Sequence, residues 1–202
     1  MKKLIKRTKV AQLQFEDLWM LKLIIFTLGT FFLATLSRRS LQNRRSHGFY
    51  RFISFEGILI LLLMNYSFWV INPYSLLQLL SWLLLFLSIL LVGQGLYFLK
   101  KAGGQSEVRG MQPENLAFEN TTNLVKEGVF NYIRHPMYSS LLLLVWGVFL
   151  KNTTVASLLV ALISTAFLIA TARQEEKENV DFFGADYERY MKTTKMFIPG
   201  FI

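Results

Sequence analysis

The sequence predicts an all-α integral membrane protein with about five transmembrane helices and a C-terminal amphipathic helix. Of its 202 residues, 53% are hydrophobic and 17% are charged, whereas a soluble domain carries about 25% charged residues. The apolar residues form blocks close to the length of about 20 residues with which a helix crosses a bilayer. Lysines and arginines gather at the ends of these blocks, where membrane proteins carry them. Because helices satisfy their own backbone hydrogen bonds, such blocks predict helical spans.

The first half of the chain is predicted to hold an interfacial segment and three spans. Residues 1–17 contain five basic residues and are expected to lie at the membrane surface. Residues 18–99 are the membrane-spanning region, with predicted spans at 18–36, 52–71 and 75–99. Asn72-Pro73 makes a tight turn between the last two. We therefore expect the second and third spans to form a hairpin with almost no loop.

Residues 100–202 are predicted to be the cofactor-binding catalytic region. Residues 100–134 are polar and lack a sustained apolar period, and long polar loops often carry function. A helical hairpin at 137–172 follows, with a short first arm and a turn at Lys151-Asn152. In the charged tail, apolar and aromatic residues recur at helical spacing, which predicts an amphipathic helix along the membrane surface.

The distribution of basic residues predicts the orientation. The connector at 38–51, the loop at 100–134 and the tail from residue 173 each contain five lysines or arginines. The two turns expected on the other side together contain one, so the basic side is predicted to face the cytosol. Five spans would place the basic N-terminus on the opposite side. The sequence therefore leaves open whether residues 18–36 cross completely.

Composition excludes several classes of function. The chain has no cysteine, so disulfides, thiolate catalysis and cysteine-bound metals are excluded. Its two histidines, His47 and His135, argue against a histidine-rich metal site, and no metal is expected. The net charge of +9 is explained by basic residues that flank apolar blocks, and no aromatic-interleaved basic stripe is present. Membrane lipid rather than nucleic acid is the expected partner, and the oligomeric state is left open.

The sharpest motif joins the polar loop to the fourth span. Residues 124–138 read LVKEGVFNYIRHPMY, in which Gly128 permits a turn and Pro136 suits the first turn of a helix. Arg134 and His135 then lie at a helix N-terminus, where exposed N–H groups favour an anionic group. On spacing alone, the pair fits equally well a helix end anchored to lipid headgroups.

Two further motifs follow the hairpin. Residues 173–176 read RQEE, and paired carboxylates leaving a membrane are costly unless they are hydrated or partnered. Glu175 is suited to accept hydrogen bonds from hydroxyls or an amine of a ligand, although a solvated helix start explains the same charges. Residues 182–190 read FFGADYERY and are followed by Pro199, which alone indicates an interfacial aromatic helix.

Taken in order, these motifs resemble the isoprenylcysteine carboxyl methyltransferase family, including its short prokaryotic members. That family shows a leucine–valine pair, a glycine, an arginine-histidine-proline-x-tyrosine element, a glutamate pair, a phenylalanine-glycine-x-x-tyrosine-x-x-tyrosine element and a proline. The corresponding residues here are Leu124-Val125, Gly128, Arg134-His135-Pro136-Met137-Tyr138, Glu175-Glu176, Phe183-Gly184, Tyr187, Tyr190 and Pro199. The resemblance covers residues 120–199, and the first hundred residues match only as membrane spans.

The resemblance implies a membrane-embedded methyltransferase that uses S-adenosylmethionine and acts on a lipophilic small molecule or a prenylated substrate. It implies a location in a bacterial inner membrane, with the active site facing the cytosol. The residues that it implies for cofactor binding are Thr122, Asn123, Leu124, Val125, Phe130, His135, Pro136, Met137, Tyr138 and Glu175. Phe130 stands where the family often has a tyrosine, so one hydroxyl contact is absent.

The predicted catalytic residues, Arg134 and Arg173, are expected to orient the methyl acceptor. In eukaryotic members of the family, an arginine near the end of the last long span holds the substrate carboxylate. That position aligns with Thr171 here, and Arg173 lies two residues later. A bidentate arginine–carboxylate pair would suit an anionic acceptor.

Two other functions remain open from the sequence. Steroid 5-alpha-reductases, which use NADPH, resemble the same C-terminal elements. They more typically continue the arginine-histidine-proline element with asparagine-tyrosine and a glycine-glutamate pair, whereas residues 137–140 here are MYSS. A non-catalytic membrane protein that binds lipid or a partner is the other alternative.

Overall fold

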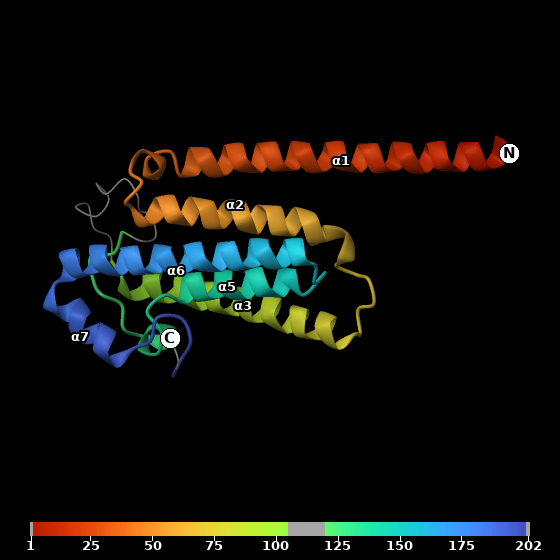
Figure 1. Ribbon diagram of the computed structural model, residues 1–202. Helices are drawn as coiled ribbons and strands as arrows, with labels where there is room; N and C mark the ends of the chain where they lie inside the picture. The colour runs from red at the N-terminus through yellow and green to blue at the C-terminus, as the bar shows by residue number, and fades with distance from the viewer. Residues whose placement is uncertain (1, 105–119, 201–202) are drawn as a thin grey trace.

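The computed structural model describes residues 2–104 and 120–200, and across these residues it contains helices and no strand. The predicted all-α fold is therefore confirmed. The long helices lie side by side in a bundle (Figure 1). They are α1 (Lys2–Leu36), α2 (His47–Asn65), α3 (Leu76–Ala102), α5 (Pro136–Phe149), α6 (Val155–Phe183) and the shorter α7 (Ala185–Thr193). Short 3-10 turns are η1 (Ser40–Gln42), η2 (Tyr66–Phe68) and η4 (Gly128–Asn131).

Four of the described helices are long and apolar enough to cross a membrane. These spans are Leu18–Leu36, His47–Phe68, Leu76–Ala102 and Val155–Phe183. The helix α5 is apolar but shorter, which agrees with the short fourth arm expected from the sequence. The chain is thus a helical membrane protein with the expected number of apolar helices.

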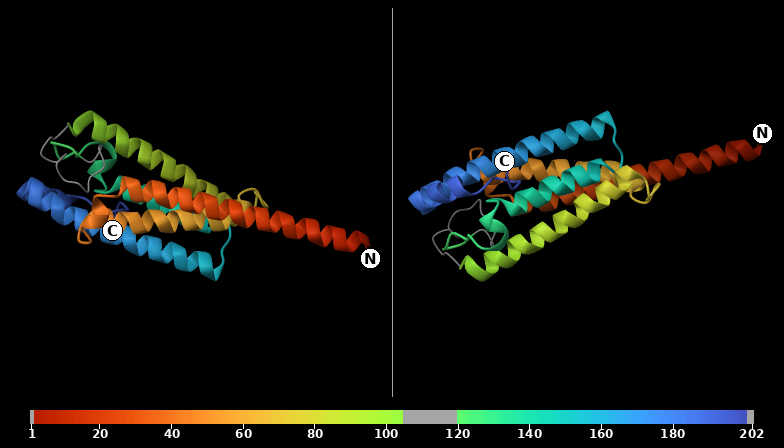
Figure 2. Two further views of the ribbon diagram at one scale, coloured as in Figure 1. Left: turned by 90° about the horizontal axis from the view of Figure 1, so that it is seen from above. Right: turned by 90° about the horizontal axis from the view of Figure 1, so that it is seen from below.

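The helix α1 differs from the predicted division into an interfacial segment and a span. It is continuous from Lys2 to Leu36, and its N-terminal part extends beyond the bundle at the end far from α7 (Figures 1 and 2). At about 1.5 Å per residue, a helix of 35 residues is longer than a bilayer core of about 30 Å. Among the long helices, α1 packs mainly against α2.

The helices α2 and α3 do not pair as the expected hairpin. The helix α2 packs mainly against α6, and α3 packs mainly against α5. The α5–α6 hairpin therefore supplies the main partners of both. Ser81 and Ser88 of α3 donate hydrogen bonds to the carbonyls of Gly147 and Ser140 of α5, at 2.6 and 2.8 Å. Small polar residues such as these hold helices together in membranes, where there is little hydrophobic driving force for helix–helix packing.

The helix α6 continues past residue 172, where the sequence analysis ends the hairpin. It reaches Phe183, so the whole glutamate motif lies on a regular helix. The predicted amphipathic tail helix is consequently divided between the end of α6 and α7. Gly184 separates the two with a φ of 59°, a left-handed conformation that glycine adopts without strain.

The contact between α2 and α6 yields a stability prediction. A Cβ atom added at Gly57 would lie 2.2 Å from Ser164 Oγ, so Gly57→Ala is expected to lower the free energy of unfolding by about 1–3 kcal/mol. Gly93 of α3 is the control, because a Cβ there meets no described atom within 4 Å. Gly93→Ala is expected to be neutral or to stabilise by up to about 1 kcal/mol. Thermal unfolding followed by circular dichroism in detergent measures both, and equal losses would contradict the close contact.

Candidate functional site

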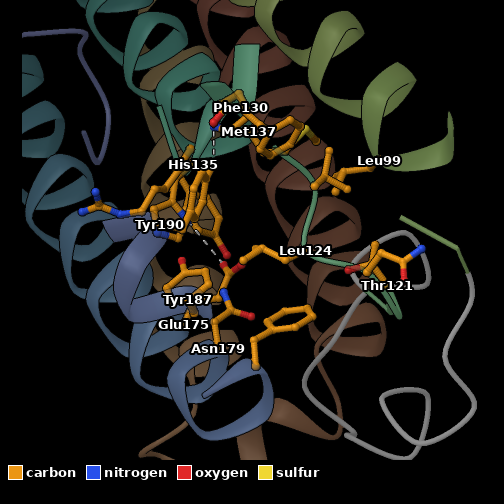
Figure 3. Close-up of a pocket in the computed structure, with 16 residues that line it drawn as sticks. Leu99, Thr121, Leu124, Phe130, His135, Met137, Glu175, Asn179, Tyr187 and Tyr190 are labelled. Atoms are coloured by element: carbon orange, nitrogen blue, oxygen red, sulfur yellow. Dashed lines mark hydrogen bonds and ion pairs between the residues drawn. The ribbon is translucent and has the colours of Figure 1, made fainter. Parts of the chain in front are cut away.

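At one end of the bundle α3 ends, α5 begins and α6 meets α7 (Figure 1). A pocket lies there (Figure 3). Its empty volume is about 620 Å³, counted to its open mouth. The lining residues are Leu99, Thr121, Asn123, Leu124, Val125, Phe130, Arg134, His135, Pro136, Met137, Tyr138, Glu175, Asn179, Phe183, Tyr187 and Tyr190.

The pocket brings together the predicted cofactor-binding residues, with the exception of Thr122. Thr122 is exposed, and the adjacent Thr121, which is buried, lines the pocket instead. Arg134 also lines the pocket, but Arg173 does not. Arg173 is exposed and lines a separate open groove together with Glu176 and Lys177. The two arginines expected to orient the acceptor therefore lie in different places.

Several lining residues were not predicted. Asn179 follows Glu175 by four residues on the same face of α6, so helical spacing alone is a sufficient signal for it. Tyr187 and Tyr190 belong to a recognised motif, but that motif alone indicated an interfacial aromatic helix rather than a pocket. Leu99 comes from α3, far away in the chain, and no local pattern marks it.

The beginning of α5 is fixed by a chain segment that lies sixty residues later. The N–H of Arg134 donates to the carbonyl of Lys195 at 2.8 Å, and the N–H of His135 donates to Met196 at 3.1 Å. The N–H of Lys195 donates in turn to the carbonyl of Tyr132 at 3.0 Å. This pairing and Pro136 at the first helical position both constrain the backbone. Together they fix the backbone of residues 132–136 beside the pocket.

Arg134 connects three parts of the fold. Its Nε donates to Glu176 Oε1 at 2.6 Å, and both side chains are nearly buried. Its Nη1 donates to the carbonyl of Met191 at 3.2 Å and to the carbonyl of Thr194. These bonds join the start of α5 to α6 and to the chain after α7. The Nε and Nη1 groups of Arg134 therefore make their hydrogen bonds within the protein.

His135 lies in the buried wall of the pocket with carboxylates near both ring nitrogens. It is 4% exposed, and its ring stacks on Tyr138 with 5.5 Å between ring centres. Nδ1 is 3.9 Å from Glu175 Oε2, and Nε2 is 3.4 Å from Glu176 Oε1. Nε2 makes no hydrogen bond with any described residue. The pocket thus contains an imidazole held between two acidic groups.

The α7 tyrosines close the pocket beside α6. The Tyr190 hydroxyl donates to the carbonyl of Phe130 at 2.6 Å, which fixes η4 against α7. Burial raises the pKa of Tyr187 and of Tyr190, and the negative charge of Glu175 raises that of Tyr187 further. Both phenols therefore remain neutral hydroxyls at physiological pH.

Comparison with known proteins shows which family the chain belongs to. Residues 77–186 match the family described as phospholipid methyltransferase. The chain belongs to this family. The matched region of this phospholipid methyltransferase family member extends from α3 through the polar loop and the α5–α6 hairpin to the start of α7. It therefore includes every lining residue of the pocket except Tyr187 and Tyr190.

The curated relatives of this phospholipid methyltransferase family member are methyltransferases by name. A methanethiol S-methyltransferase from Pseudomonas deceptionensis is 35% identical over 72 residues, or 36% of this chain and 27% of the relative. A protein-S-isoprenylcysteine O-methyltransferase from Schizosaccharomyces pombe is 35% identical over 77 residues, or 38% of this chain and 33% of the relative. The aligned part thus covers about a third or less of these relatives. No solved structure matches the chain.

Proposed function

We propose that the protein is a membrane-embedded methyltransferase that uses S-adenosylmethionine as its methyl donor. The observation that carries the proposal is the pocket, in which the loop at 121–125, the start of α5 and Glu175 of α6 meet around one cavity. Membership of the phospholipid methyltransferase family and the names of the relatives support methyl transfer. No observation favours the NADPH-dependent reductase.

The lining residues fit the chemical groups of S-adenosylmethionine. The Glu175 side chain is 21% exposed and offers a carboxylate to an ammonium group or to hydroxyls. Leu124, Phe130 and Phe183 offer apolar surface to an adenine ring. A ligand with an apolar ring, hydroxyls and a cationic end matches this set.

Bound in this pocket, S-adenosylmethionine supplies an electrophilic methyl group on a positively charged sulfur. What the protein adds is alignment of the acceptor, which can contribute several kcal/mol. The buried side chains of Tyr138, Tyr187 and Tyr190 exclude water from the inner wall. His135, whose Nδ1 lies 3.9 Å from Glu175 Oε2, receives the proton that a protonated acceptor releases.

We propose that the acceptor arrives protonated, as an apolar thiol, rather than as a carboxylate. A carboxylate acceptor releases no proton and needs a cation. Among the described lining residues, the permanent cation is Arg134, whose Nε and Nη1 are bonded to Glu176, Met191 and Thr194. A thiol loses its proton when its sulfur is methylated, and the pocket provides His135 to receive it. One named relative acts on methanethiol, which supports this class.

We further propose that the pocket faces the cytosol of a bacterial inner membrane. Residues 38–51, 100–104, 120–134 and 173–200 lie at the pocket end of the bundle (Figure 1). In the sequence, the segments 38–51, 100–134 and 173–202 each contain five lysines or arginines, the bias that cytoplasmic loops show.

Calorimetry with purified protein tests the donor assignment. S-adenosylmethionine is expected to bind, and NADPH is expected not to bind. Glu175→Gln removes a charged hydrogen bond worth about 1.5–3 kcal/mol, so it is expected to weaken binding of S-adenosylmethionine by roughly tenfold or more. Glu188→Gln, an exposed change on α7, is the control and is expected to bind as wild type does.

Two results would contradict this assignment. Binding of NADPH alone would replace the methyltransferase with the reductase. Unchanged affinity in Glu175→Gln would show that Glu175 is a solvated helix residue and that the pocket holds the donor differently.

A further inference from the structure

The groove that contains Arg173 lies on the other side of Glu176 from the donor pocket. Its lining residues are Arg173, Glu176, Lys177, Val180, Asp181 and Met191. Glu176 lines the groove while its carboxylate is bonded to Arg134, which lines the donor pocket. The Arg134–Glu176 pair is therefore a common wall. Nothing in the proposed methyl transfer uses the groove itself.

The charge of the groove is positive where it is nearest the membrane. Arg173 and Lys177 are exposed, one helical turn apart, and form no ion pair with any residue that the structure describes. The charge of Glu176 is matched by Arg134, which leaves Asp181 as the remaining acidic group, one turn farther along α6. An anion thus meets two unpaired cations here and one carboxylate.

An apolar stripe on α6 leads directly to these cations. Val155, Leu159 and Leu162 are 76%, 55% and 47% exposed, and their spacing of three or four residues places them on the face of α6 that also carries Arg173 and Lys177. From Val155 to Arg173 the helix rises by roughly 27 Å at about 1.5 Å per residue. This is close to the hydrocarbon thickness of about 30 Å, so Arg173 lies at the level of the headgroups.

We propose that the Arg173–Lys177 groove binds the phosphate of an anionic phospholipid, whose acyl chains lie along the exposed stripe of α6. The stripe offers apolar contact to acyl chains, which a free anion lacks. The two cations attract a net negative charge, which a zwitterionic lipid lacks. Because the Arg134–Glu176 pair forms the wall between groove and pocket, the lipid phosphate lies beside this pair. The proposal does not depend on the identity of the methyl acceptor.

Native mass spectrometry of the delipidated protein, titrated with phosphatidylglycerol or phosphatidylcholine, tests this site. Wild type is expected to retain phosphatidylglycerol more tightly. The double variant Arg173→Gln/Lys177→Gln is expected to lose affinity for phosphatidylglycerol on the order of fivefold for each cation removed. Arg38→Gln/Arg39→Gln, which removes the same charge from exposed positions in the connector before α2, is expected to bind as wild type does.

Three outcomes would overturn the proposal. The first is equal affinity of wild type for the two lipids. The second is a loss in the double variant no larger than the loss in the connector control. The third is competition by glycerol phosphate, which lacks acyl chains, at the same concentrations as phosphatidylglycerol, because it would identify a general anion site instead. All changed side chains are exposed, and circular dichroism checks that each variant is folded.

Discussion

His135→Gln is expected to slow methyl transfer to an alkyl thiol by on the order of a hundredfold or more, since proton transfer by a positioned base contributes about 10²–10⁴. Glutamine keeps much of the size of the imidazole and can donate a hydrogen bond, but it cannot take the proton of the thiol. His135 is the buried group whose Nδ1 lies 3.9 Å from Glu175 and whose Nε2 lies 3.4 Å from Glu176. The measurement is the rate of transfer of labelled methyl groups in detergent or lipid.

A second acceptor distinguishes proton transfer from a structural effect of this substitution. An aromatic thiol that is already ionised at the assay pH needs no base, because the thiolate is the nucleophile. The variant is therefore expected to methylate this thiol at a rate much closer to that of wild type. With the alkyl thiol, the rate of the variant should rise with pH as the thiol ionises.

Equal losses with both thiols would show that His135 only supports the pocket. Preference of the wild-type protein for a lipophilic carboxylate would refute the proposed thiol class while leaving the donor assignment intact. Absence of transfer to every acceptor, with S-adenosylmethionine still bound, would instead favour the non-catalytic alternative.

Arg134→Gln is expected to lower the free energy of unfolding by about 3–5 kcal/mol, the cost of breaking a buried ion pair by removing one partner. Glu176, 7% exposed, would be left buried without its arginine, with His135 Nε2 at 3.4 Å as its remaining partner among the described residues. The carbonyls of Met191 and Thr194 would lose their donor. The start of α5 would lose its connection to α6. Affinity for S-adenosylmethionine should therefore fall as well. Chemical unfolding followed by circular dichroism and calorimetry measure the two effects.

Arg189 provides the matched control for this variant. It pairs with Asp186, but the two side chains are 72% and 64% exposed, so Arg189→Gln is expected to cost less than about 1 kcal/mol. The double variant Arg134→Gln/Glu176→Gln should recover part of the lost stability, because no buried charge is then left alone. If Arg134→Gln keeps full stability and donor affinity while turnover falls, Arg134 orients the acceptor as the sequence analysis expected.

The sequence predicted correctly those structural elements that depend on residues close together in the chain. The apolar blocks predicted the described spans because their length and composition are set along one segment. The turn at Gly128 and the helix start at Pro136 were predicted because they are local features. That residues from Leu124 to Tyr138 form one pocket wall was implied by the resemblance to a family. Placing Glu175 beside that wall required the resemblance to a family, since forty residues separate it from His135.

The sequence by itself thus determined a helical membrane protein and the segments that form its pocket, and only the tertiary structure decided the positions and partners of the charged side chains. Because α6 continues through the glutamate motif, each residue turns by about 100° from the last. Arg173 and Glu175 therefore lie on nearly opposite sides of α6, so that Arg173 lines the groove and Glu175 lines the pocket. Arg134 donates hydrogen bonds to Glu176 and Thr194, which lie 42 and 60 residues later in the sequence. Such pairings depend on how α5, α6 and the C-terminal segment pack, which no local pattern specifies.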